Sequence, residues 1–273
     1  MPTFHRDGLN FYFEEHGSGI PLIFSHGLSG NADQAKELVG DVPGFRVIFY
    51  DNRGHGKTGD PGNIANLHFQ TMADDVLALM NHLSIDKAVV GGVSMGAGIA
   101  LAFCLAHPSR TLAAVLTRPA WLNHPEPPNL AMFPAIAAMI QEAGIEKARQ
   151  LFEQSDIYAE WRKSYPPATT MIDGFFTGRT LEAIVATYQA IPCSVPYRSR
   201  VELQGITAPL LVLGNRRDPI HPFEYAEAWA AAIPNAQLKE FPSKADGLEQ
   251  HTVAFRKDLR EFLRTIQRPE STN

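Results

Sequence analysis

The chain has 273 residues and a net formal charge of −5, and its composition is 45% hydrophobic and 19% charged. This balance is typical of a globular protein with a sizeable core, so we expect disorder only in residues 268–273. No block of Lys or Arg suggests nucleic-acid binding, no apolar segment near Met1 resembles a secretory signal, and the apolar stretch 131–140 is too short to span a membrane. We therefore expect a cytoplasmic protein whose two cysteines, Cys104 and Cys193, are free thiols.

Short apolar runs alternate along the chain with segments of helical periodicity. The apolar runs predict strands at residues 10–14, 21–25, 45–50, 87–93, 112–117, 209–214 and 236–241. The helical segments predict helices at residues 71–83, 95–106, 223–232 and 251–266. This alternation predicts an α/β fold in which helices cover a mainly parallel sheet.

Residues 120–200 interrupt the alternation, because they are rich in proline, aromatic residues and helical segments and contain no clear strand. We predict that they form a helical cap subdomain over the strand ends, inserted into a core domain made of residues 1–119 and 201–273. Most aromatic side chains of the cap are expected to fill its own core. A few, with Trp121 and Phe133 as candidates, are expected to line an apolar substrate pocket.

Residues 92–96 read G-V-S-M-G and match the pattern G-x-S-x-G. An apolar, β-branched strand precedes them and a helix of small residues follows, which is the context that a nucleophilic serine requires. The sharp turn from strand to helix lifts the serine above the sheet, and only small neighbours such as Gly92 and Gly96 fit there. Ser94 is therefore the predicted nucleophile, the alternative being a serine that only caps the helix.

An oxyanion formed by attack of Ser94 needs two hydrogen-bond donors that point at one position. The backbone N–H of Met95, directly after the nucleophile, is one candidate. The backbone N–H of Leu28, which follows His26 and Gly27 at the end of a predicted strand, is the other. We interpret His26 as a structural histidine that holds this loop.

Several pieces in this order resemble the α/β-hydrolase family. They are H-G-L at residues 26–28, D-N-R-G-H-G-K-T at residues 51–58, the G-V-S-M-G pentapeptide, and a late Asp and His. The second piece is similar to the D-x-R-G-x-G-x-S turn of the family, where it is structural. The resemblance implies an α/β-hydrolase fold, serine hydrolase chemistry and no cofactor.

The family order of nucleophile, acid and histidine implies that Asp218, in the loop after the predicted strand 209–214, is the acid of a catalytic triad. This carboxylate would hold the imidazole in one tautomer and stabilise the imidazolium. Arg118 follows the predicted strand 112–117, at a position where it could meet a substrate carboxylate or form a structural ion pair.

His251, at the start of the last predicted helix, is the candidate base. The family usually has its histidine in a Gly-His pair directly after the last strand, where this chain reads P-S-K-A-D-G at residues 242–247. The competitor is His221, three residues after Asp218. We prefer His251, because His221 shares a loop with the acid and the prolines on both sides restrict that backbone.

The sequence thus predicts a serine hydrolase that cleaves a small carboxylic ester through an acyl-enzyme on Ser94. A lactonase similar to the enol-lactone hydrolases, a C–C or amide hydrolase and an acyltransferase would use the same triad and remain alternatives. A ligand-binding protein with little turnover is the alternative from another class. The scattered histidines show no metal-ligand spacing, and the natural substrate and the oligomeric state stay open.

Overall fold

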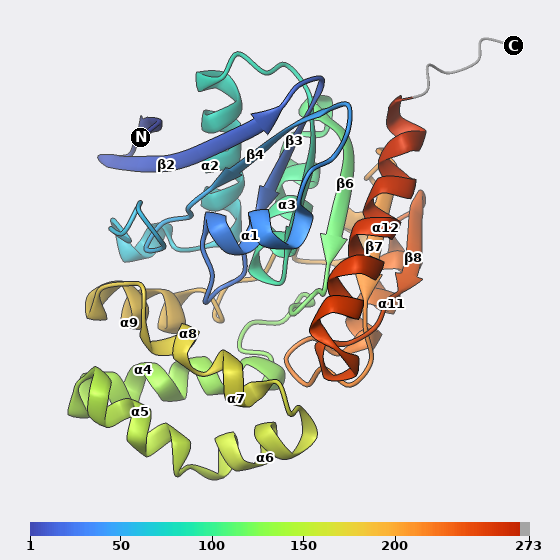
Figure 1. Ribbon diagram of the computed structural model, residues 1–273. Coiled ribbons are helices and arrows are strands. Elements are labelled where there is room, and N and C mark those ends of the chain that lie inside the picture. The colour runs from blue at the N-terminus through green and yellow to red at the C-terminus, as the bar shows by residue number, and fades with distance from the viewer. Residues whose placement is uncertain (268–273) are drawn as a thin grey trace, which may run out of the picture.

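A computed structural model of the protein describes residues 1–267. It contains an eight-stranded sheet with the strand order β1-β2-β4-β3-β5-β6-β7-β8 (Figure 1). The strands are β1 (Thr3–Arg6), β2 (Leu9–Gly17), β3 (Ile20–Ser25), β4 (Phe45–Tyr50), β5 (Ala88–Val93), β6 (Thr111–Thr117), β7 (Leu210–Gly214) and β8 (Ala236–Glu240). The expectation of disorder at residues 268–273, and the end of the predicted core domain, lie outside the described residues.

The sheet is parallel from β4 to β8 and antiparallel at one edge. β1 pairs antiparallel with β2, and β2 pairs antiparallel with β4, whereas all pairs among β4, β3, β5, β6, β7 and β8 are parallel. The prediction of a mainly parallel sheet is therefore confirmed. Strand β1 was not predicted, because four residues with one buried side chain give no readable periodicity.

Two layers of helices cover the sheet. Helices α2 (Phe69–His82), α3 (Met95–Ala106) and α11 (Phe223–Ala232) contribute to the apolar core on one face. Helices α1 (Ala32–Val39) and α12 (Leu248–Gln267) contribute to a second core on the opposite face. No helix within residues 1–267 is both long enough and apolar enough to cross a membrane.

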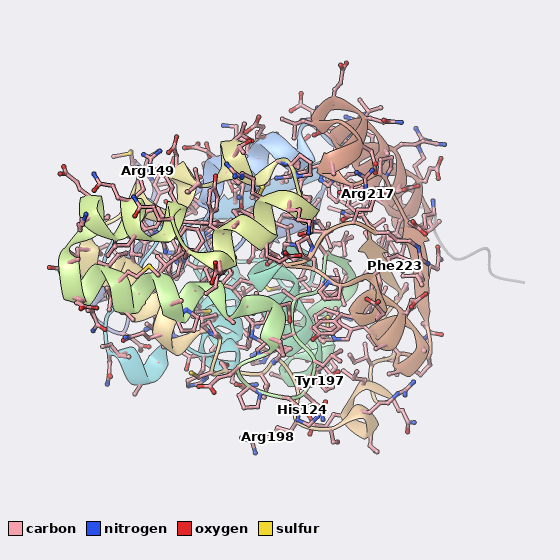
Figure 2. All side chains as sticks on the ribbon, turned by 90° about the horizontal axis from the view of Figure 1, so that it is seen from below. His124, Arg149, Tyr197, Arg198, Arg217 and Phe223 are labelled. Carbon is pink, nitrogen blue, oxygen red and sulfur yellow. The ribbon has the colours of Figure 1, made fainter. Side chains whose placement is uncertain are left out.

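The chain between β6 and β7 is helical. Its helices are α4 (Met132–Ala143), α5 (Ile145–Glu153), α6 (Asp156–Ser164), α7 (Ala168–Met171), α8 (Asp173–Phe176), α9 (Leu181–Ala190) and the short α10 (Arg200–Leu203), together with the 3₁₀ turn η3 (Pro128–Leu130). Figure 1 shows α4 to α9 gathered below the sheet, and Figure 2 looks onto them, with Arg149 of α5 at one side and Arg217, after β7, at the other. No strand is described between residues 118 and 209, but the predicted division into core and cap stays a prediction.

Parallel strands bring their carboxyl ends to one edge of the sheet, and the residues that follow them meet there. The strands β3, β5 and β6 end at Ser25, Val93 and Thr117, and are followed by His26, Ser94 and Arg118. The loops after β7 and β8 contain Asp218 and a 3₁₀ turn η4 (Lys244–Asp246). The polar residues singled out in the sequence therefore come from different loops at the same edge.

Candidate active site

Ser94 occupies a strained turn between β5 and α3. Its backbone lies in the left-handed region, with φ 59° and ψ −114°, a conformation that costs a non-glycine residue about 1–3 kcal/mol. The turn is held by the N–H of Ser94, which donates to the carbonyl of Thr117 at 2.9 Å, and by the N–H of Ala97, which donates to the carbonyl of Ser94 at 3.0 Å. A β-carbon on Gly92 would collide with Gly96, and one on Gly96 would collide with the carbonyl of Ser25, so the tight turn requires both glycines.

Ser94 faces a cavity of about 810 Å³ at the carboxyl edge of the sheet. The loop after β3 forms part of its lining, together with polar residues from the loops after β6, β7 and β8. The helical region between β6 and β7 contributes Phe133 of α4, Met171 of α7 and Phe175 of α8. The cavity therefore combines one polar wall with an apolar one, as small-molecule sites commonly do.

The loop after β3 lies directly against Ser94. A β-carbon on Gly27 would be 3.6 Å from the Cβ of Ser94, and the Gly27 N–H is held by the side chain of Gln34 at 3.0 Å. Among the hydrogen bonds of the described residues, none uses the N–H of Leu28 or that of Met95 as a donor. Two free N–H groups beside a nucleophile suit an oxyanion hole, which stays a prediction.

Buried histidines hold this loop in place. The Nδ1 of His26 lies 2.8 Å from the carbonyl of Gly27, and its Nε2 accepts the N–H of Asn52 at 3.0 Å. Burial lowers the pKa of His26 to about 4, so the ring is neutral at pH 7. The Nε2 of His55 contacts the carbonyl of Leu28 at 2.8 Å. Both nitrogens of His26 are thus occupied by backbone groups, which agrees with a structural role.

Asp218 is buried and fully engaged. Its Oδ2 accepts hydrogen bonds from the Nε of Arg118 at 3.0 Å and from the terminal nitrogen of the same guanidinium at 2.5 Å, and its Oδ1 accepts the N–H of Ile220 at 3.2 Å. Burial raises the pKa of Asp218, but the charge of Arg118 and the contact with His221 outweigh it and hold the pKa well below its usual value. Arg118 therefore makes the ion pair that was one of its two predicted roles, while it also lines the cavity.

His221 is the histidine that contacts the acid. Its Nδ1 lies 3.0 Å from the Oδ2 of Asp218 and 2.9 Å from a terminal nitrogen of Arg118, two contacts that require opposite tautomers. Its Nε2 is buried and has no partner within the described part of the chain. Burial, followed by the charge of Arg118, lowers the pKa of His221 to about 4. A turn in which the N–H of His221 donates to the carbonyl of Asp218 folds the ring back onto the carboxylate, which sequence reasoning had not anticipated.

His251 also lines the cavity but is held differently. It lies in the first turn of α12, and its Nδ1 donates to the carbonyl of Pro242 at 2.8 Å. This bond leaves Nε2 without a proton in the neutral ring. Burial and then the charge of Arg118 lower its pKa to about 4. No hydrogen bond between His251 and Asp218 is found among residues 1–267, so the triad of Ser94, His251 and Asp218 stays a prediction.

The predicted pocket residues have different positions. Phe133 lines the cavity. Trp121 is fully buried, its ring lies edge-on to Phe69 with the ring centres 5.1 Å apart, and it is not among the described residues that line the cavity. Lys244, which sequence reasoning had passed over, lines the cavity together with Ser94. The only signal for it was its place in the loop directly after the last strand.

Comparisons with known proteins agree with this architecture. A family model described as alpha/beta hydrolase fold matches residues 20–246. The AB hydrolase superfamily protein YisY of Bacillus subtilis is 28% identical over 251 residues, which are 89% of this chain and 90% of that protein. A non-heme chloroperoxidase of Streptomyces lividans is 27% identical over 274 residues, 95% of this chain and 98% of the relative. The structure of a malate-bound thermophilic esterase from Thermogutta terrifontis superposes with a TM-score of 0.75 at 25% identity, covering 97% of each chain.

Proposed function

Because this chain belongs to the alpha/beta hydrolase fold family, we propose that it is an enzyme that hydrolyses small carboxylic esters through an acyl intermediate on Ser94. The match of residues 20–246 to the family model shows the family, and the mainly parallel sheet confirms the expected α/β-hydrolase fold. The observation that carries the ester proposal is the strained turn that presents Ser94 to a cavity beside two free backbone N–H groups. The named esterase of similar structure supports the same class of reaction.

In the proposed reaction the Oγ of Ser94 attacks the ester carbonyl and loses its proton to a base, while the carbonyl oxygen becomes an oxyanion. The N–H groups of Leu28 and Met95 donate hydrogen bonds to this oxyanion, and the N-terminus of α3 favours its negative charge. The alcohol leaves with the proton of the base. Water then attacks the acyl-enzyme in the same way, and the acid product leaves Ser94 free.

The proposed base is His251. A base must be unprotonated on the nitrogen that faces the substrate, and the carbonyl of Pro242 provides this by holding the proton on Nδ1. The low pKa of about 4, which results first from burial, keeps the ring neutral at pH 7. In this arrangement a backbone carbonyl orients the imidazole. We keep Asp218 as the proposed acid of the triad, as inferred from the sequence. In this structure its carboxylate contacts Arg118 and His221.

His221 is the second candidate for the base, and one observation favours it. Its Nδ1 contacts Asp218, as the histidine of a triad contacts its acid, and its buried Nε2 has no partner among the described residues. The nearby Arg118 opposes the protonated form of this ring and that of His251 alike. We place the base at His251, because its Nδ1 contacts one group, the carbonyl of Pro242, which sets the tautomer, whereas the Nδ1 of His221 contacts both Asp218 and Arg118. The two histidines are tested against each other below.

A fluorophosphonate probe tests the nucleophile directly. We expect one covalent adduct, on Ser94, when the labelled protein is digested and mapped by mass spectrometry. The variant Ser94→Ala should lose on the order of 10⁶-fold in kcat on 4-nitrophenyl butyrate, because the nucleophile and its base act as a unit. The variant Ser199→Ala, at an exposed serine, is the matched control.

Two results would overturn the proposal. One is labelling at Ser29, the neighbouring serine of the same cavity, in place of Ser94. The other is steady turnover of lactones or amides by a preparation that leaves short esters untouched, which would keep the serine mechanism but reject the ester as substrate class.

A further inference from the structure

One cation that lines the cavity, Lys244, has no partner in the described part of the chain. The Nζ of Lys244 takes part in no hydrogen bond or ion pair among residues 1–267, although its side chain lines the cavity together with Ser94. The other two cations that line the cavity are both engaged. Arg118 is paired with Asp218, and Arg256 donates to the backbone carbonyls of Glu37 and Leu38.

The backbone of Lys244 is held firmly. It opens the turn η4, which begins with a capping box: Ser243 accepts the N–H of Ala245 at 3.2 Å, and Asp246 accepts the N–H of Ser243 at 2.9 Å. Asp246 also pairs with Arg217 at 2.5 Å. The nearest acid in the turn of Lys244 is therefore already bound to other groups.

The surroundings of Lys244 compensate its charge only in part, through the carboxylates of Asp218 and Glu37. Burial, followed by the charge of Arg118, lowers the pKa of Lys244 to about 8. Asp218, a buried acid behind the cavity lining, is already shared by Arg118 and His221. Glu37 and Glu249 line the cavity, and Glu37 attracts the ammonium, but both are exposed side chains that make no ion pair with it among residues 1–267. The lining thus brings two cations, Arg118 and Lys244, close together, and the one buried acid nearby is already bound.

An ammonium group that is partly buried without a counterion is unfavourable unless a ligand supplies the negative charge. A carboxylate suits this position, because charge-assisted hydrogen bonds from Lys to a carboxylate are stronger than neutral ones. The part of the lining that comes from α4, α7 and α8, with Phe133, Met171 and Phe175, is apolar and suits a short carbon chain. A bound molecule can therefore place a carbonyl at Ser94 and a carboxylate at Lys244 within one cavity.

We propose that Lys244 binds a free carboxylate of the substrate, so that the preferred substrates are small esters that carry a second, ionised carboxyl group, such as half-esters of short dicarboxylic acids. This inference rests on the proposed ester hydrolysis at Ser94 and specifies its substrate class. Lys244 is assigned a role in specificity, and the proton transfer stays with the histidines.

The test compares two esters of the same chain length and leaving group, 4-nitrophenyl hydrogen glutarate and 4-nitrophenyl pentanoate. For the unchanged protein we expect kcat/KM to be at least about 10-fold higher for the glutarate, since one charge-assisted hydrogen bond changes binding by about 10- to 100-fold. In Lys244→Gln the ratio of the two kcat/KM values should fall to about 1, mainly through KM of the glutarate. Lys244→Arg, which keeps the positive charge, should keep most of the preference. Lys87→Gln, at an exposed lysine, is the control for loss of one positive charge.

A binding measurement separates this inference from the proposed function. In the Ser94→Ala background, glutarate should bind in calorimetry, and the additional change Lys244→Gln should weaken that binding by about 10-fold or more. If neither ester is turned over but glutarate binding depends on Lys244, the hydrolase proposal fails and the carboxylate site stands. The inference is wrong if Lys244→Gln lowers kcat/KM of both esters equally and leaves glutarate binding unchanged. It is also wrong if Lys244→Arg is inactive on both esters, because a lysine whose charge cannot be replaced by arginine would be acting as a base.

Discussion

The two sides of the cavity around Ser94 are built in different ways. On one side, the loop after β3 and the turn after β5 present backbone N–H groups, and glycines bring the two segments together. On the other side, the loops after β6, β7 and β8 and the first turn of α12 present the charged or titratable side chains of Arg118, His221, Lys244 and His251. We call these the backbone side and the charged side.

The two sides also differ in how strictly the fold determines the arrangement of their groups. The backbone side has one arrangement, because strand ends and steric contacts at Gly92 and Gly96 determine where its N–H groups lie. On the charged side, a group can contact more than one partner. Asp218, for example, contacts both Arg118 and His221, and of the two histidines one contacts this acid while the other, His251, contacts a backbone carbonyl. We therefore propose that the backbone side sets the type of reaction and that the base and the substrate are selected on the charged side.

The largest effect that tests this comparison concerns the two histidines of the charged side. We expect His251→Gln to lower kcat on a short ester by about 10⁴-fold or more, because it removes the base, and His221→Gln to lower it by about 100-fold or less. Stopped-flow and steady-state assays on the same ester measure both, and circular dichroism confirms that each variant is folded. An inactive His221→Gln beside a largely active His251→Gln would move the base to His221.

A smaller effect is expected from breaking the buried ion pair. Arg118→Met should lower the free energy of unfolding by about 3–5 kcal/mol, because it leaves the charge of Asp218 buried and unpaired. The double variant Arg118→Met/Asp218→Leu should recover most of this loss, since it removes both charges. Urea denaturation at pH 7 measures the three proteins.

The matched control for the ion pair is Arg216→Met. Arg216 pairs with Glu240 at 3.2 Å, but both side chains are about half exposed, so its removal should change the free energy of unfolding by about 1 kcal/mol or less. Equal losses in Arg118→Met and Arg216→Met would show that burial does not distinguish the two pairs.

The smallest effect concerns pH and applies to both sides. Burial lowers the pKa of His26, on the backbone side, and of His251, on the charged side, to about 4, whereas an unfolded histidine has a pKa near 6.5. The unfolded chain therefore binds more protons between pH 6.5 and 4, so the stability that these neutral rings contribute is present above pH 6.5 and is lost as the pH falls through this window. Each histidine should account for about 2 kcal/mol of lost stability between pH 7 and pH 5.

Urea denaturation at pH 7 and pH 5 measures this loss. His26→Gln and His251→Gln should each reduce the difference between the two pH values, and His5→Gln, at an exposed histidine, should leave it unchanged. A pH-independent stability in the unchanged protein would mean that the pKa values of these rings are the same in the folded and the unfolded state.

Most of the fold was predictable because its signals are local. The strands β3 to β7 are short apolar runs, and their alternation with helical periodicity was enough to predict a mainly parallel sheet. The antiparallel edge was not predictable in the same way, because β1 has too few residues to show a period. Trp121 was expected at the pocket because it is aromatic and lies in the predicted cap, but its burial against Phe69 depends on contacts between distant segments.

The sequence by itself determined that Ser94 lies at a strand-to-helix turn between glycines, because that turn is specified by five consecutive residues and their steric limits. It also placed Leu28 and Asp218 in loops that follow predicted strands, and His251 at the start of the last predicted helix. Only the tertiary structure decided which charged groups contact each other. Arg118 and Asp218 are 100 residues apart in the chain, and among residues 1–267 the Nζ of Lys244 makes no hydrogen bond or ion pair, because the acids near it are bound elsewhere or exposed. Such pairings depend on where separate loops end in space, and no local pattern of residues specifies that.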